Sequence, residues 1–196
     1  MAFALEKGKH YTYRDYLTWP DDIRCELING EVYMMTPAPI LMHQDVVGEI
    51  FFQTKQALKG NSCRALVAPL DVRLPKNNQA DEDTDVVVQP DVFVVCDANK
   101  LDYRGVRGAP DWIVEVISPS SASRDQIEKR RIYERHGVLE YWLVHPNDRL
   151  VTIYRLQNGE YGKPDIYKLE GETSVGVLSD VSIDWEAVSP YLSSEE

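Results

Sequence analysis

Two acidic residues stand in stretches of the sequence that are otherwise strongly apolar. Glu115 lies in the middle of DWIVEVIS (111–118), and Asp91 follows Pro90 in VVVQPDVFVVCD (86–97). Burying an unpaired carboxylate is so costly that such acids are usually paired, protonated or bound to a metal ion. Two carboxylates directed into one cleft suit Mg²⁺ or Mn²⁺, which activates water and polarises a phosphoryl oxygen. Either acid taken alone is more commonly a solvated or salt-bridged residue at a strand end.

Chemistry of this kind usually also needs a cation near the carboxylates. The position two residues after Glu115 is Ile117, which cannot supply one. Further along the chain, Asp125, Lys129 and Tyr133 follow one another at intervals of four residues, which places them on one face of a helix. That face could turn toward the cleft and bring Lys129 to it. Alternatively, Asp125 and Lys129 form an ordinary surface ion pair.

The strands that would position the two acids are indicated by hydrophobic periodicity. Apolar residues that alternate or run continuously predict strands over 63–74, 86–97, 111–118 and 138–146, with loops over 75–85 and 99–110. Asn29-Gly30 between two short apolar arms predicts a β-hairpin near the N-terminus. A second hairpin pair is expected over 149–168, followed by a short strand and a terminal turn or helix.

Two helices are expected between these strands. Apolar residues spaced at three and four predict a helix from Leu41 to Leu58. Ser123 is the expected N-cap of the second helix, with Gln126 as its capping-box partner and Gly137 at its end. Strands that read as buried on both faces, together with these helices, predict a mixed α/β fold in which helices pack on a central sheet.

Length and charge narrow the class of protein. A chain of 196 residues is expected to form a single domain over 1–196. It has no apolar run long enough for a membrane helix, and Glu6 and Lys7 interrupt its N-terminus, so no secretory signal is expected.

The net charge of −11 disfavours an ordinary nucleic-acid binder, although a local basic patch can outweigh it. Arg104 and Arg107 are candidates for phosphate contacts.

Cysteine usage points to a reducing compartment. Cys25, Cys63 and Cys96 are odd in number, far apart and without a CxxC pair. This pattern disfavours a disulfide framework or a structural zinc site and is typical of buried free thiols. We therefore expect a cytoplasmic protein.

Several segments together resemble a known family. They are ELINGEV (26–32), PDVFVV (90–95), VEVISPSS (114–121), Asp125 to Lys129, Tyr133 and GVLEYWLVHP (137–146). In this combination the chain resembles the bacterial restriction-endonuclease-like family of the Uma2 type, a family of unknown function within the PD-(D/E)xK nuclease superfamily. The resemblance covers about 26–146, leaving 147–196 as a C-terminal β extension.

The resemblance implies a restriction-endonuclease-like core, a central mixed sheet flanked by helices, in a homodimer. It implies that Asp91 and Glu115 bind Mg²⁺ or Mn²⁺. The superfamily lysine, normally two residues after the glutamate, is displaced in this family to the following helix, at Lys129. Glu26 and His43 match further family positions and are possible auxiliary residues. Glu26 could equally be a solvated strand residue, and a histidine near a helix start is more often a cap or a surface residue.

Two hypotheses about function follow. In the first, the protein is a Mg²⁺-dependent endonuclease acting on DNA, with Asp91, Glu115 and the carbonyl of Val116 at the metal and Lys129 assisting the phosphoryl chemistry. In the second, the fold is kept without efficient catalysis, as a dimeric binding or accessory module. The acidic net charge and the residue at position 117 favour the second.

Overall fold

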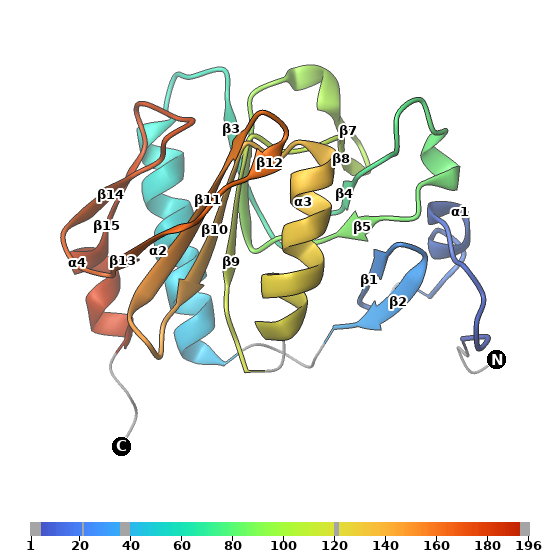
Figure 1. Cartoon of the computed structure of the whole chain (residues 1–196), viewed down its shortest axis with the longest axis horizontal. Helices are drawn as coiled ribbons and strands as arrows, with labels where there is room; N and C mark the ends of the chain where they lie inside the picture. The colour runs from blue at the N-terminus through green and yellow to red at the C-terminus, as the bar shows by residue number, and fades with distance from the viewer. Residues whose placement is uncertain (1–4, 21, 36–39, 120–121, 193–196) are drawn as a thin grey trace.

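The computed structural model describes residues 5–20, 22–35, 40–119 and 122–192. Two large β-sheets and one two-stranded sheet near the C-terminus are present in the described residues, and α-helices pack on the faces of the largest sheet (Figure 1). The larger sheet runs in the spatial order β12 (Glu160–Tyr161), β11 (Leu150–Gln157), β10 (Glu140–His145), β9 (Trp112–Val116), β6 (Val92–Val95) and β3 (Arg64–Val67), with β13 (Asp165–Lys168) also paired to β11. The β9–β10 pair is parallel and its neighbours are antiparallel, so the sheet is mixed. The mixed α/β class expected from the sequence is confirmed.

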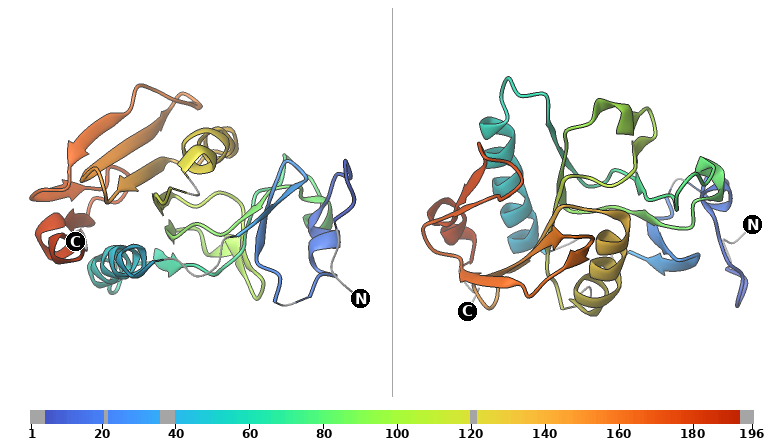
Figure 2. Two further views of the ribbon diagram at one scale, coloured as in Figure 1. Left: turned by 90° about the horizontal axis from the view of Figure 1, so that it is seen from below. Right: turned by 45° about the horizontal axis from the view of Figure 1, so that its top comes forward.

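Helices cover both faces of the larger sheet (Figure 2). On one face, α2 (Leu41–Ala57) packs Val46 and Ile50 against Trp112 and Val114. On the other face, α3 (Arg130–His136) packs against residues such as Ile113. Neighbouring residues of β9 therefore bury opposite faces, as strand alternation requires. The C-terminal elements lie beside α2: β14 (Glu172–Ser174), β15 (Ser182–Asp184), α4 (Trp185–Val188) and η4 (Ser189–Leu192).

The smaller sheet contains the N-terminal hairpin. Its spatial order is β2 (Glu31–Met34), β1 (Cys25–Ile28), β5 (Val87–Val88), β4 (Val72–Arg73), β8 (Gly105–Arg107) and β7 (Leu101–Asp102). The short helices α1 (Tyr13–Tyr16), η1 (Asp81–Asp83) and η2 (Ala98–Lys100) connect to it. The hairpin turns at Asn29 and Gly30, whose φ angles of 51° and 78° belong to a type I′ turn. A Cβ at Gly30 would lie 2.3 Å from the His10 ring, and its φ of 78° is one that other residues rarely adopt, so glycine is favoured there.

Two predicted strands are each divided between the two sheets. The segment 63–74 forms β3 and β4, and the segment 86–97 forms β5 and β6. The breaks fall at Pro69 and Pro90, which have no N–H to donate to a strand ladder. The prediction of continuous strands was wrong because a proline inside an apolar run moves the chain from one sheet to the other. The predicted loop 99–110 likewise contains the β7–β8 pair.

The second helix does not begin as predicted. Ser123 has helical angles, φ −68° and ψ −36°, and its side chain makes no capping hydrogen bond. It is therefore not the N-cap, and the capping box with Gln126 is wrong. The segment η3 (Arg124–Lys129) is a π-helix that continues directly into α3. Gly137 ends α3 in the left-handed conformation, with φ 85°, as expected.

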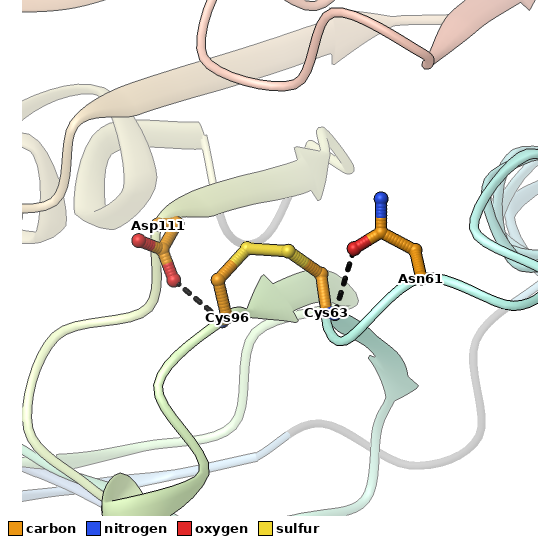
Figure 3. Close-up of a disulfide and its surroundings, with 4 residues drawn as sticks. All are labelled: Asn61, Cys63, Cys96 and Asp111. Atoms are coloured by element: carbon orange, nitrogen blue, oxygen red, sulfur yellow. Dashed lines mark hydrogen bonds between the residues drawn. A yellow bond between two sulfur atoms is a disulfide. The ribbon is translucent and has the colours of Figure 1, made fainter.

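Two of the cysteines are bonded to each other. Cys63 and Cys96 form a disulfide, and Cys25 is a buried free thiol (Figure 3). The β3–β6 register pairs Arg64 with Val95, so the two cysteines occupy the next opposed position. The expectation of three free thiols was wrong because strand register, which sequence spacing does not reveal, brings them together. The disulfide also removes the cysteine-based argument for a reducing compartment. None of the helices in the described part of the chain is long and apolar enough to cross a bilayer.

Candidate active site

Strand register places the two predicted acids side by side. In the antiparallel β6–β9 pair, Val92 lies opposite Val114. Continuing this register by one residue sets Asp91 opposite Glu115. Asp91 Oδ2 accepts a hydrogen bond from the backbone N–H of Val116 at 2.8 Å, which fixes the Asp91 carboxylate against the end of β9. Because Asp91 lies where the chain crosses between sheets, its side chain keeps 20% exposure while Glu115 is buried.

Lys129 reaches Glu115 from the helical layer. Lys129 Nζ and the Tyr133 hydroxyl both donate to Glu115 Oε1, each at 2.9 Å. The π-helical segment that contains Lys129 is an unusual element that is frequently found at functional sites. Lys129, which the resemblance assigns in place of a lysine at position 117, thus contacts Glu115 from the helix that follows β9.

Lys129 is surrounded by acidic side chains. Its Nζ lies 2.9 Å from Glu26 Oε1 and from Glu115 Oε1, and 3.4 Å from Asp125 Oδ1. Each of these four side chains is at most 5% exposed. The alternative of an ordinary Asp125–Lys129 surface pair is therefore wrong. We name Glu26, Glu115, Asp125 and Lys129 the acidic cluster.

Glu26 and His43 both lie at this site. Glu26 Oε1 also accepts from the backbone N–H of Gln89 at 3.0 Å, so the reading of Glu26 as a solvated strand residue is wrong. His43, near the start of α2, has its Nε2 3.3 Å from Asp91 Oδ2 and a side chain that is 13% exposed. It is therefore not a surface residue. The five residues singled out from the sequence converge.

The pKa shifts at this site arise from burial and from neighbouring carboxylates. Burial raises the pKa of Glu115 well above its usual value; Lys129 opposes this, while the other carboxylates add to it. Burial lowers the pKa of Lys129, but the carboxylates outweigh it, so its pKa is raised well above the usual value and it stays an ammonium. Burial likewise lowers the pKa of His43, and Asp91 outweighs this, so the pKa is raised.

The donor set fits a small divalent cation. Three carboxylates meet Lys129 in the acidic cluster, and Arg124 lies 3.7 Å from Glu26, so the site is rich in the carboxylate oxygens that a small divalent cation prefers. Among the described residues, the hydrogen bonds to Glu115 fall on Oε1 and those to Asp91 on Oδ2, leaving Oε2 and Oδ1. No group of three or more His, Cys, Asp or Glu in the described ranges is arranged to hold a metal. Two carboxylates are nevertheless sufficient for Mg²⁺, which usually keeps several waters.

Some residues at or near the site were not identified from the sequence. Arg124 Nη1 lies 3.7 Å from Glu26 Oε2, and its Nε is buried without a partner among the described residues. In the sequence, only its position next to Asp125 pointed to Arg124 as a residue of the site. Arg107, proposed for phosphate contacts, instead pairs with Asp81. Arg104 lines a cavity outside the acidic cluster.

Comparisons with known proteins agree with this fold. A family model described as "Uma2: Putative restriction endonuclease" matches residues 13–186. No curated protein matches the chain. A solved structure described as a "putative nuclease belonging to DUF820 from Anabaena variabilis ATCC 29413" is 20% identical, covers 92% of this chain and 98% of its own, and has a TM-score of 0.72. At that identity the likeness shows a shared nuclease-like fold. Because the family model spans most of the chain, the family predicted from the sequence is confirmed, and the protein belongs to the Uma2 family.

Proposed function

We propose that the protein is an endonuclease that uses Mg²⁺ or Mn²⁺ to hydrolyse phosphodiester bonds in DNA. The observation that carries this proposal is the convergence of Asp91 and Glu115 from adjacent strands with Lys129 donating to Glu115. Family membership and the nuclease-like fold support the reaction class. We propose Mg²⁺ or Mn²⁺ because both ions prefer carboxylate oxygens as ligands. We propose DNA as the substrate because the family is described as a putative restriction endonuclease.

Each side chain has a defined task in this proposal. Asp91 and Glu115 would hold the metal, which when bound supplies an activated water and polarises the phosphoryl oxygen. Val116 fixes the Asp91 carboxylate through its N–H, and Tyr133 and Lys129 orient Glu115. Because Lys129 stays protonated, it would stabilise negative charge and would not act as the general base.

Cleavage assays with site variants test the proposal. DNA is incubated with Mg²⁺, Mn²⁺ or EDTA, and products are followed on gels. We expect metal-dependent cleavage that falls at least about a hundredfold in Asp91→Asn, Glu115→Gln and Lys129→Met, since each removes a ligand or a preorganised charge. Glu170→Gln and Lys168→Met are matched controls, because these residues form a surface pair 3.7 Å apart with side chains more than 70% exposed. Full activity in all three site variants would refute the proposal.

A second function is an inactive nuclease-fold dimer that serves as a binding or accessory module. The observation that favours it is that Lys129 already compensates part of the charge of three buried carboxylates. Calorimetry with Mg²⁺ and Mn²⁺, and light scattering for the dimer, separate the two functions. Absence of metal binding, together with wild-type stability in Asp91→Asn and a dimeric mass, would support the accessory module over the nuclease.

A further inference from the structure

The outer face of α2 carries five residues in a regular pattern. α2 forms an outer layer of the molecule, with its buried side on the larger sheet (Figure 2). On the side opposite this sheet, Leu41, Asp45, Gly48, Phe52 and Lys55 follow one another at alternating intervals of four and three residues. This spacing makes a straight stripe along a helix and is the a/d spacing of a helix–helix seam. We name these five residues the α2 stripe.

Two large apolar side chains of the α2 stripe are exposed. Leu41 is 69% exposed and Phe52 is 57% exposed, although α2 already buries Val46 and Ile50 on its other side. One exposed apolar side chain needs no explanation on a protein surface, but a repeated one on a single seam indicates a docking surface. The two residues lie about three turns apart on the same side of the helix.

Gly48 lies between these apolar residues, where nothing inside the chain requires a glycine. It is exposed in the middle of α2, and a Cβ at this position would have no described atom within 4 Å. Glycine inside a helix is destabilising relative to alanine, because the unfolded chain gains more conformational freedom from it. The missing side chain leaves a hollow in the α2 stripe, which allows a large side chain from outside to approach the helix closely.

Charges in the α2 stripe are separated along the helix. Asp45 lies in the N-terminal half of α2 and Lys55 in its last turn. Within the part of the chain that the structure describes, neither side chain forms an ion pair, and Lys55 Nζ lies 5.3 Å from the centroid of the Phe51 ring. Each end of the stripe therefore carries a charge that is complementary to the other end.

We propose that the α2 stripe is the interface between two copies of this chain, whose α2 helices pack antiparallel. A two-fold axis level with Ile50 sets Gly48 opposite Phe52 of the second copy, and Asp45 opposite Lys55 of the second copy. Each contact occurs twice, as two-fold symmetry requires. The Phe52 ring fills the hollow at Gly48 as a knob enters a hole.

The opposite orientation of the two helices is disfavoured by charge. In a parallel pair, each residue of the α2 stripe lies opposite its own copy, so Asp45 meets Asp45 and Lys55 meets Lys55. Like charges that face each other across two helices repel, whereas the antiparallel pair converts both contacts into attractions. The pattern of the stripe therefore selects one register and one direction.

The interface lies apart from the candidate active site. α2 also carries His43, which contacts Asp91 from the buried side of the helix. None of the five site residues belongs to the α2 stripe, so the interface does not depend on the proposed nuclease function. A single helix pair is at the small end of specific interfaces, and we expect a dimer in reversible equilibrium with the monomer.

Charge exchange tests the proposed register. Asp45→Lys places two lysines opposite each other, and Lys55→Asp places two aspartates opposite each other. Each variant should raise the dissociation constant of the dimer about tenfold, because two attractive pairs become repulsive. An equimolar mixture of the two variants should dimerise as the wild type does, since every pair then joins a lysine to an aspartate. Lys163→Asp is the control, because Lys163 is exposed outside the α2 stripe.

Filling the hollow separates association from folding. Gly48→Gln should weaken the dimer at least about tenfold, because its side chain occupies the place of the Phe52 ring. The same variant should be at least as stable as the wild type in urea at a concentration where both are monomers, since glutamine is the better helix former and meets no neighbour. Sedimentation velocity up to millimolar protein in EDTA measures the association.

Three outcomes would overturn the proposal: a monomeric wild type at every concentration, wild-type association in both charge variants, or a mixture of these variants that does not recover. Asp91→Asn and Glu115→Gln should dimerise as the wild type does, because neither residue lies in α2. A dimer that responds as expected without cleavage contradicts only the nuclease function. A monomeric protein that cleaves DNA contradicts only the interface.

Discussion

At the scale of single residues, Lys129 has the most unusual environment in the acidic cluster. It is an ammonium with a side chain that is 5% exposed, and it contacts Glu26, Glu115 and Asp125. A buried ion pair adds little stability compared with an apolar pair, yet removing one partner leaves the others uncompensated. Lys129 is therefore a structural counter-ion whatever its role in catalysis.

Replacing Lys129 should destabilise the protein in a way that a second substitution partly repairs. Lys129→Met is expected to lower the free energy of unfolding by about 3–5 kcal/mol, because three buried carboxylates lose their cation. Glu26→Gln in the same chain should recover part of this loss by removing one of these charges. Urea unfolding at neutral pH in EDTA measures both effects, and a Lys129→Met variant as stable as Lys168→Met would contradict this account.

At the scale of elements, prolines and strand register decide how the site is assembled. Pro90 ends β5 in the smaller sheet, so that Asp91 precedes β6 in the larger sheet. Glu115 comes from β9 of the larger sheet and Glu26 from β1 of the smaller one. The acidic cluster therefore joins the two sheets, with η3 supplying the cation. Register also opposes Cys63 and Cys96 at the ends of β3 and β6.

Removing the disulfide should weaken the β3–β6 pairing. Cys63 and Cys96 are separated by 33 residues, so the crosslink restricts the unfolded chain, and the double serine variant should lose about 3–4 kcal/mol. Urea unfolding with and without reductant measures the difference, and the reductant should not affect the double variant. Thiol titration in denaturant should find one reactive thiol, from Cys25, before reduction and three after it. Three thiols before reduction would refute the crosslink.

At the scale of the whole molecule, a ligand that binds the acidic cluster should stabilise both sheets together. Asp91 and Glu115 are adjacent only in the folded chain, because 24 residue positions separate them in sequence and strand pairing unites them. A metal bound there has little affinity for the unfolded chain. Its binding free energy is therefore added to the stability of the fold.

Thermal unfolding with and without metal tests this coupling. Mg²⁺ or Mn²⁺ at a hundred times its dissociation constant should stabilise the wild-type protein by about 2.7 kcal/mol, seen as a higher Tm. Asp91→Asn and Glu115→Gln should show a much smaller increase, whereas Glu170→Gln should behave as the wild type. An equal increase in all variants would place the bound metal elsewhere.

The sequence by itself determined the fold class, the family and the residues from which the candidate site is built. Apolar periodicity locates β9 and α2, and one carboxylate inside each apolar run is visible because charge is rare there. Lys129 was selected as a candidate through the family pattern, and its helical spacing from Asp125 and Tyr133 was consistent with that choice. These are local features, so they can be recognised without knowing which strands pair.

Only the tertiary structure decided which groups meet. The division of 63–74 and 86–97 between two sheets, the Cys63–Cys96 bond and the contact of Glu26 with Lys129 all depend on pairing between distant segments. The cavity lined by Arg104 arises in the same way, since its lining comes from separate parts of the chain. Contacts between segments far apart in the sequence have no local signature, because loop closure and core packing select them only when the whole chain folds.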